Sequence, residues 1–180
     1  KSTAATTTVT EGTTVYYSTD GKELTDDTKV WSTEVPTVTN VADSKSVDVK
    51  AENSNYETAT AKYSLTINPA EVTVKAADEE FKYDGAAHSN STYTVDGLVA
   101  SDGSEISAVV TGSITNVTES PVKNVLVSYV FTKGTAGNYS VTKKNGSLTM
   151  TVADAKDLGL TVADNGLIAT KQRVQPRRQQ

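Results

Sequence analysis

The side chains able to carry acid–base or nucleophilic chemistry are few in this chain of 180 residues. His88 is the only histidine and there is no cysteine, so a thiolate nucleophile, a disulfide and a multi-histidine metal site within one chain are excluded. A Ser-His-Asp arrangement would have to use His88. Because His88 follows the turn-like run Tyr83-Asp84-Gly85, we expect it to have a structural role. The sequence therefore predicts no enzyme activity and no cofactor.

A cluster of carboxylates lies between residues 78 and 84, at Asp78, Glu79, Glu80 and Asp84. Clustered oxygens beside a joint between domains can bind calcium and stiffen an array. The Asp-x-Asp-x-Asp-Gly spacing of a calcium loop is absent, so we favour a solvated acidic loop. The four carboxylates remain the calcium candidates.

The aromatic candidates for ligand binding are Tyr16, Tyr17 and Trp31. Trp31 is the only tryptophan and lies between Val30 and Ser32 in a predicted strand, which is typical of the core residue of a small sandwich. The alternative is an exposed Trp31 that forms a sugar-stacking platform with Tyr16 or Tyr17. We favour core burial, because a small sandwich without disulfides needs a large apolar side chain.

Alternation of apolar and polar residues predicts the elements that must position these side chains. Before Asn68-Pro69, the apolar residues recur at every second position, at Ala59, Ala61, Tyr63, Leu65 and Ile67. Pro69 lacks a ladder donor and marks a joint between strands. The pattern predicts an all-β fold of two tandem immunoglobulin-like β-sandwich domains, 1–68 and 69–153, followed by a tail at 154–180. Such sandwiches fit the turn spacing better than a barrel.

The two halves also share short sequences at a period of about 80 residues. Thr39-Asn40-Val41 recurs as Thr115-Asn116-Val117, and Ser64-Leu65-Thr66-Ile67 recurs as Ser147-Leu148-Thr149-Met150. This repetition indicates two copies of one unit. From the alternation we expect these apolar side chains to be buried: Leu65, Ile67, Val125, Val127, Tyr129, Leu148 and Met150.

The second half resembles a known family. The run from Phe81 to Ser89, which contains Tyr83-Asp84-Gly85-Ala86-Ala87-His88, is similar to the Y-D-G-x-x-H opening of MBG-type immunoglobulin-like repeats. The run from Asn138 to Met150 resembles that family's closing N-Y-x-I and G-x-L-x-I. The resemblance covers residues 70–153, and a weaker related repeat covers 13–68. It implies repeats of large secreted or wall-attached bacterial surface proteins, without catalytic residues, and a loop in which His88 bonds the backbone.

The charge is unevenly distributed. The chain has a net charge of −5, whereas residues 154–180 carry +2, so the body carries about −7 and is a poor nucleic-acid binder. No apolar run is long enough to insert in a membrane. Within the tail, Asp164-Asn165-Gly166 is a hairpin signal between two apolar runs. The candidate assembly residues of the tail are Leu158, Leu160, Val162, Leu167, Ile168, Arg173, Arg177 and Arg178.

Three functions remain open at this stage. The leading hypothesis is a non-catalytic structural module of an extracellular stalk, adhesin or fibre on the bacterial cell surface, which contacts neighbouring repeats or identical subunits. A second is a module that binds carbohydrate or protein, including host or surface glycans. A third is a subunit of an extracellular filament or phage surface, in which the tail docks on another subunit by strand addition.

Overall fold

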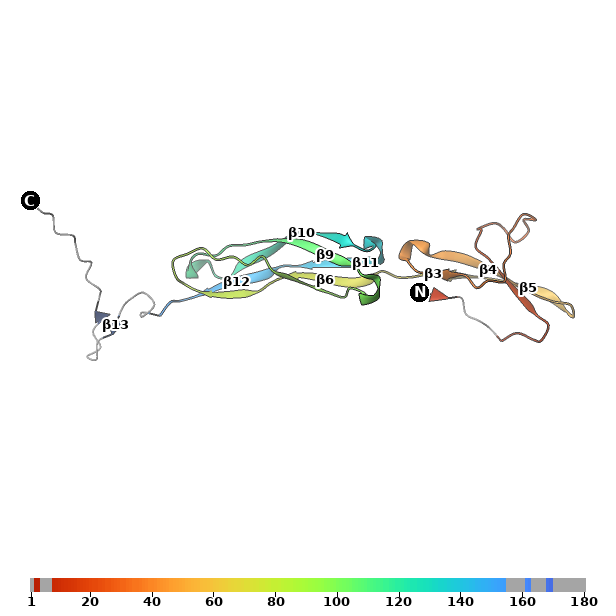
Figure 1. Ribbon diagram of the computed structural model, residues 1–180, viewed down its shortest axis with the longest axis horizontal. Helices are drawn as coiled ribbons and strands as arrows, with labels where there is room; N and C mark the ends of the chain where they lie inside the picture. Colours follow the sequence, from red (N-terminus) through yellow and green to blue (C-terminus); the bar gives the residue numbers. More distant parts are fainter. Residues whose placement is uncertain (1, 4–7, 155–160, 163–167, 170–180) are drawn as a thin grey trace, which may run out of the picture. The chain divides into compact units, whose positions relative to one another are not determined.

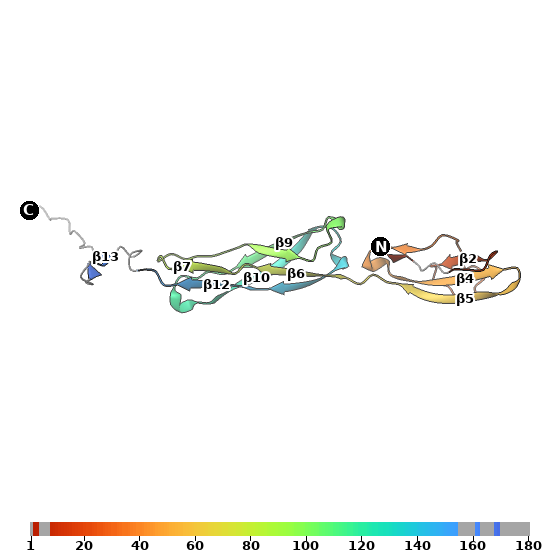
Figure 2. The ribbon, with the colours of Figure 1, turned by 90° about the horizontal axis from the view of Figure 1, so that it is seen from below.

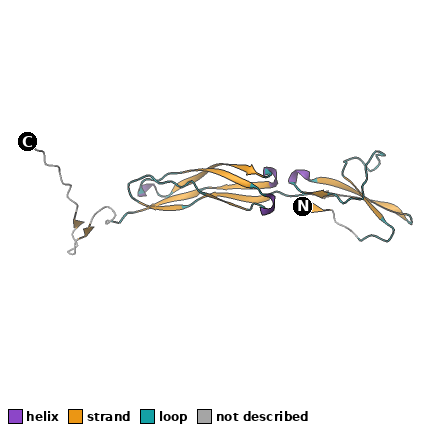
Figure 3. Cartoon of the chain, viewed as in Figure 1, coloured by secondary structure: helices purple, strands orange, loops and turns teal. Residues whose placement is uncertain are grey.

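A computed structural model describes residues 2–3, 8–154, 161–162 and 168–169 of the chain. Strands account for 51% of it. The described residues contain four short 3₁₀ turns and no α-helix (Figure 3). The predicted all-β, sandwich-like class is therefore confirmed. None of the helical segments described could span a membrane.

The chain divides into two compact units. The first runs to Glu71 and includes the segment Gly134–Ser140, and the second holds Val72–Lys133 together with the residues from Val141 onward. Within the first unit, the side chain of Asn138 accepts the Val41 N–H at 2.9 Å. The sequence-based boundary at Asn68-Pro69 lies just ahead of this division.

The first unit is built around a three-stranded antiparallel sheet (Figure 1). Its strand order is β2 (Thr14–Ser18), β4 (Lys45–Asn53) and β5 (Tyr56–Leu65). The short strands β1 (Ser2–Thr3) and β3 (Thr37–Val38) pair separately, and the 3₁₀ turn η1 (Val41–Asp43) leads from β3 into β4. Among the described strands, β5 has β4 as its neighbour on one side and nothing on the other.

The second unit contains two sheets, as a sandwich requires. One has the order β7 (Glu79–Lys82), β12 (Gly146–Thr151), β10 (Val122–Lys133) and β9 (Glu105–Thr111). In this sheet β12 lies between β7 and β10 (Figure 2) and pairs in parallel with β7. The other has the order β11 (Tyr139–Lys144), β6 (Ala70–Ala76) and β8 (Tyr93–Asp96). The 3₁₀ turns of this unit are η2 (Ala100–Asp102) and η3 (Val117–Glu119), while η4 (Ala136–Asn138) lies in the segment that belongs to the first unit.

Both units contain the same capped turn ahead of their long strand. In the first, the Asp43 carboxylate accepts the Asn40 N–H at 2.9 Å and the Asn40 side-chain amide at 3.0 Å. In the second, Glu119 accepts the corresponding bonds from Asn116 at 3.0 and 3.1 Å. The Asn40 backbone N–H is the main cause of a lowered pKa for Asp43, and the Thr115 backbone N–H is the main cause of a lowered pKa for Glu119. The sequence repeat therefore corresponds to a repeated piece of structure.

The residue after each capped turn then holds the closing strand of its unit. The hydroxyl of Ser44 accepts the Ile67 N–H at 3.1 Å, and the hydroxyl of Ser120 accepts the Met150 N–H at 3.0 Å. We call these two bonds the serine clamps. The first clamp ties the end of segment 64–67 to the turn before β4. The second ties the end of segment 147–150 to the turn before β10.

Each unit has its own small apolar core. In the first unit, Leu65 packs with Tyr17, Val38 and Val47. In the second, Leu148 and Met150 pack with Ile114, and the half-buried rings of Phe81 and Tyr83 cover them. Burial of Leu65, Leu148 and Met150 is confirmed, whereas Ile67 is half-buried.

The predicted burial of Val125, Val127 and Tyr129 is wrong, because all three are exposed. At this end of β10 the inward positions belong to Asn124 and Leu126, which are 0% and 3% exposed. The pairing with β9 then slips between Leu126 and Ser128, so Val127 is the extra residue of a β-bulge. Apolar residues at both odd and even positions of β10 hid this register from the sequence.

The tail contains one described pair of strands. Strand β13 (Thr161–Val162) pairs antiparallel with β14 (Ile168–Ala169), with Val162 opposite Ile168. The other candidate assembly residues, Leu158, Leu160, Leu167, Arg173, Arg177 and Arg178, lie outside the described residues.

Replacement of Leu148 tests the core of the second unit. Leu148 is fully buried between Ile114 and Met150, so Leu148→Ala should lower the free energy of unfolding by about 2–4 kcal/mol, as for other core leucines. The matched control is Val127→Ala, whose side chain is 50% exposed on the bulge. Urea unfolding measures both. A loss for Leu148→Ala no larger than for Val127→Ala would contradict the packing described.

Candidate ligand-binding site

Two aromatic rings and a lysine meet on one face of the first sheet. Tyr16 on β2 lies directly opposite Lys50 on β4. The Lys50 ammonium lies 5.0 Å from the centre of the Tyr16 ring and 4.8 Å from that of Trp31, within the range of cation–π attraction. We call Tyr16, Trp31 and Lys50 the aromatic patch. Lys50 also pairs with Glu52 at 2.9 Å, two positions further along β4.

Trp31 does not fill the core, which corrects the preferred prediction for it. Its ring is half-buried and has lysine ammonium groups on it, at 4.8 Å from Lys50 and 5.5 Å from Lys29. The core position nearby belongs to Tyr17, which is 9% exposed and whose backbone exchanges two hydrogen bonds with Ser32. That bridge holds the Trp31 loop against β2. Because adjacent residues of a strand face opposite sides, Tyr17 points inward and Tyr16 joins the patch.

A buried ion cluster lies beside the patch. The side chain of Lys29 is 1% exposed, and its ammonium lies 2.7 Å from Asp48 Oδ2 and 3.1 Å from Asp20 Oδ1. It also donates to the carbonyl oxygen of Lys22 at 2.6 Å. These acceptors match the three N–H donors of an ammonium group, so its charge is satisfied without water. Lys62 lies 3.6 Å from the second Asp48 oxygen.

The charges of the cluster stabilise one another. The hydrogen bond to Asp48 is the main cause of a raised pKa for Lys29. The Val30 N–H, which donates to Asp20 Oδ2 at 2.8 Å, is the main cause of a lowered pKa for Asp20. Lys29 and Asp20 therefore stay charged near neutral pH. The cluster joins the loop that carries Trp31 to β4 and so fixes the position of the patch.

A shallow depression lies in the first unit. Its lining includes Asp20, Val30, Ser32, Glu34 and Thr37, and none of the three patch residues. The walls therefore offer two carboxylates, hydroxyls and an apolar side chain. Such a mixture suits a hydroxyl-rich or weakly charged ligand better than a purely apolar one.

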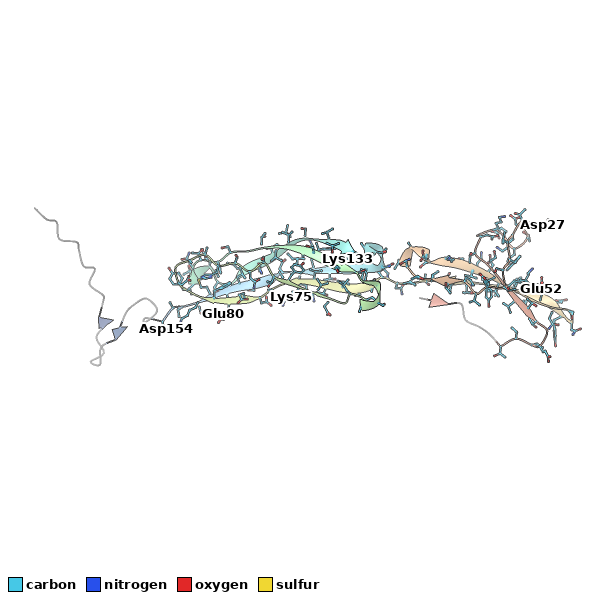
Figure 4. The ribbon with its side chains drawn as sticks, viewed as in Figure 1. Asp27, Glu52, Lys75, Glu80, Lys133 and Asp154 are labelled. Carbon is cyan, nitrogen blue, oxygen red and sulfur yellow. The ribbon has the colours of Figure 1, made fainter. Side chains whose placement is uncertain are left out.

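The calcium candidates are not gathered into one site. Asp78 pairs with Lys75 at 2.6 Å, and Glu79 accepts a bond from Asn90 at 2.9 Å. Asp84 Oδ1 lies 2.9 Å from His88 Nε2. Glu80 is exposed on β7 (Figure 4). Among the described residues, no group of three or more acidic or histidine side chains is placed to hold a metal ion.

His88 is part of a turn that closes the second unit. Its backbone exchanges hydrogen bonds with Ile114 at 2.9 and 3.0 Å. Its ring stacks on Phe81 with centroids 4.7 Å apart, and its Nε2 lies 2.9 Å from Asp84 Oδ1, which lowers the pKa of Asp84. The ring thus bonds a carboxylate, whereas the expectation was a backbone group.

No family model, curated protein or solved structure matches the chain. The chemistry of the patch must therefore be argued from its geometry alone.

The sequence predicted Tyr16 and Trp31 as candidates but missed Lys29, Lys50 and Asp48. Asp48 alternates with Val47 and Val49 in its strand, which predicts an exposed carboxylate and gives no sign of a buried partner cation. Nothing local in the sequence identifies Lys29 as that cation, because 19 residues separate the two.

Loss of the buried ammonium should destabilise the first unit. Lys29→Met keeps much of the side-chain volume but leaves Asp48 buried without its closest cation, so we expect a clearly lower melting temperature. Lys75→Met is the matched control, because the Lys75–Asp78 pair is exposed and exposed pairs contribute little. Thermal unfolding followed by circular dichroism compares the two. Equal, small shifts would show that the Lys29 cluster is dispensable.

Proposed function

We propose that the chain is a non-catalytic structural segment made of two copies of one immunoglobulin-like module. It belongs to a stalk, adhesin or fibre of a bacterial cell-surface or secreted protein. The observation that carries the proposal is the repetition of the capped turn and of the serine clamp, with the same donors and acceptors in both units. Repetition of one module is how extended arrays are built.

The only imidazole of the chain also supports a structural role. His88 is stacked on Phe81 and held by Asp84, inside a turn whose backbone is bridged to Ile114. The resemblance of residues 70–153 to MBG-type repeats points the same way, towards modules that repeat along surface proteins. Neighbouring repeats, or identical subunits, are then the natural partners of the segment.

Force spectroscopy tests the array proposal. The full chain is held between two reference domains and pulled. Two unfolding events are expected, each releasing roughly 20 nm, because an extended chain spans about 3.4 Å per residue. Glu119→Gln should weaken one of the two events and Asp43→Asn the other, since each removes one turn's charged acceptor.

One cooperative event that both variants weaken would refute two modular copies. The cellular part of the proposal needs a separate experiment, in which antibodies against the chain are applied to intact cells of the source organism. Surface labelling that mild external protease removes is expected. Labelling only after lysis would contradict a surface location.

The aromatic patch supports a second candidate function, binding of a carbohydrate. The half-exposed rings of Tyr16 and Trp31 share the Lys50 ammonium, at 5.0 and 4.8 Å from the ring centres. Aromatic faces stack on sugar rings, and a cation between them adds affinity for an acidic sugar.

Trp31 reports directly on this candidate, because it is the only tryptophan of the chain. Titration with a panel of neutral and acidic oligosaccharides should change its fluorescence in a saturable way. Tyr16→Ala should abolish the change, whereas Tyr129→Ala in the second unit should leave it intact. Fluorescence that stays constant across the panel would exclude a glycan site at the patch.

A further inference from the structure

The Ser-Leu-Thr sequence that closes each unit has very different neighbours in the two copies. In the second unit, Leu148 pairs with Glu79 and Met150 with Phe81 across the parallel β12–β7 ladder. In the first unit, the corresponding Leu65 pairs with Lys45 of β4, and no described strand lies on its other side.

In the second unit, the closing segment 147–150 makes several contacts with the adjacent strand β7 and the residue before it. The Ser147 N–H donates to the Asp78 carboxylate at 2.9 Å, and the Thr149 hydroxyl donates to the Glu79 carbonyl at 3.3 Å. The Phe81 ring of the same strand packs on the core that contains Met150. Three kinds of contact therefore hold β7: a charge-assisted bond, ladder bonds and an aromatic cover.

The first unit keeps the groups that make these contacts. Ser64 and Thr66 stand where Ser147 and Thr149 stand, and both are exposed. The Ile67 N–H points inward to Ser44, as the Met150 N–H points to Ser120. Successive N–H groups of a strand point to opposite edges, so those of Ser64 and Thr66 face the open one. Ile67 is half-buried, whereas Met150, at the corresponding position beside Phe81 and Tyr83, is 3% exposed.

We propose that the open edge at residues 64–68 is a strand-acceptor site. It binds an extended acidic segment of a separate polypeptide, parallel to β5, with an aromatic residue that covers Ile67. This inference deepens the proposed function, since it rests on the two units being copies of one module. The occupant's chemistry follows from β7, which places Asp78, Glu79 and Phe81 against the same groups.

One cation lies along the edge. The exposed Lys62 lies on β5 just ahead of the site and is 3.6 Å from Asp48, whereas Lys45 lies on β4, across β5 from the open edge. The acidic character of the occupant therefore rests on the second unit, where the Asp78 carboxylate accepts the Ser147 N–H. The segment Asp78-Glu79-Glu80 of the second unit has this acidic character, which makes its sequence a suitable probe.

The residue ahead of the site sets where an incoming strand can begin. At Gly146 the carbonyls of Ala76 and Ala77 pass so closely that a Cβ would collide with them. The first unit has Tyr63 at the corresponding position, opposite Val47 as Gly146 is opposite Asn124. The Tyr63 ring would block a chain that crosses there, so the incoming strand must begin at Ser64.

The test uses the full chain and a synthetic peptide with the sequence of residues 77–85. Hydrogen exchange should slow by about tenfold or more at the Ser64 and Thr66 amides, as newly formed ladder bonds protect them. The Ile67 amide, already bonded to Ser44, should change little and serves as the internal control. A peptide with Phe81→Ser should bind at least about tenfold more weakly, because it loses the aromatic cover.

A pair of protein variants locates the site. Ser64→Pro removes the edge N–H that would meet the peptide's carboxylate and should weaken binding by about tenfold. Ser64→Ala keeps that N–H and should bind as the parent chain does. Circular dichroism checks that both variants fold, and the Phe81→Ser peptide tests the contact without altering the protein.

Three results would overturn the proposal. One is no change of exchange at Ser64 and Thr66 with saturating peptide. Another is protection confined to Leu148–Thr151, which would show exchange with β7 of the second unit. The third is protection already present in the free chain and lost on deletion of residues 155–180, because the chain's own tail would then be the occupant. Each leaves the two events of the pulling experiment unaffected, so the array proposal is judged separately.

Discussion

The architecture of both units depends on one constraint: where a strand extends beyond the residues paired with its neighbour, its backbone amides still need hydrogen-bond acceptors. In each unit the closing segment extends past the start of the neighbouring long strand. A serine hydroxyl accepts the amide left over, Ser44 for Ile67 and Ser120 for Met150. The turn before each serine is held by a hydrogen bond from an asparagine N–H to a carboxylate three residues later, Asn40 to Asp43 and Asn116 to Glu119. An unmet buried amide would cost more than either bond contributes, so the turn and the strand are retained together.

Alternation in the sequence predicted the strands and the core positions Leu65, Leu148 and Met150, because one side of those strands is apolar throughout. It failed on β10, where valines occupy both faces and Asn124 takes a buried place. A polar residue inside and a bulge at Val127 are set by neighbours distant in sequence. Trp31 was misplaced for a related reason, since the loop that carries it is positioned by the Lys29 cluster. Composition and spacing do not report such contacts.

The Lys29 cluster shows how a small β-unit positions a surface site without a large core. Burying an ammonium and two carboxylates costs solvation energy, which is recovered only if every donor has an acceptor. That requirement fixes the loop geometry closely: Lys29 reaches Asp20, Asp48 and the Lys22 carbonyl at once. The Trp31 ring lies 5.5 Å from the same ammonium, two residues along the chain from Lys29. Specificity of position, not net stability, is what such a cluster supplies.

The two copies differ at one position, where the size of the side chain determines whether another segment of backbone can pass over the closing strand. Gly146 leaves room for the backbone of Ala76 and Ala77, which then continues into β7 and closes the edge of β12. Tyr63 fills the corresponding place in the first unit, and the edge of β5 has no neighbour among the described strands. Sheets commonly protect such edges with charge or proline. Here Ser64-Leu65-Thr66 carries neither, although Lys62 and Pro69 flank it. The outward N–H groups of Ser64 and Thr66 are therefore the donors that an added strand would use.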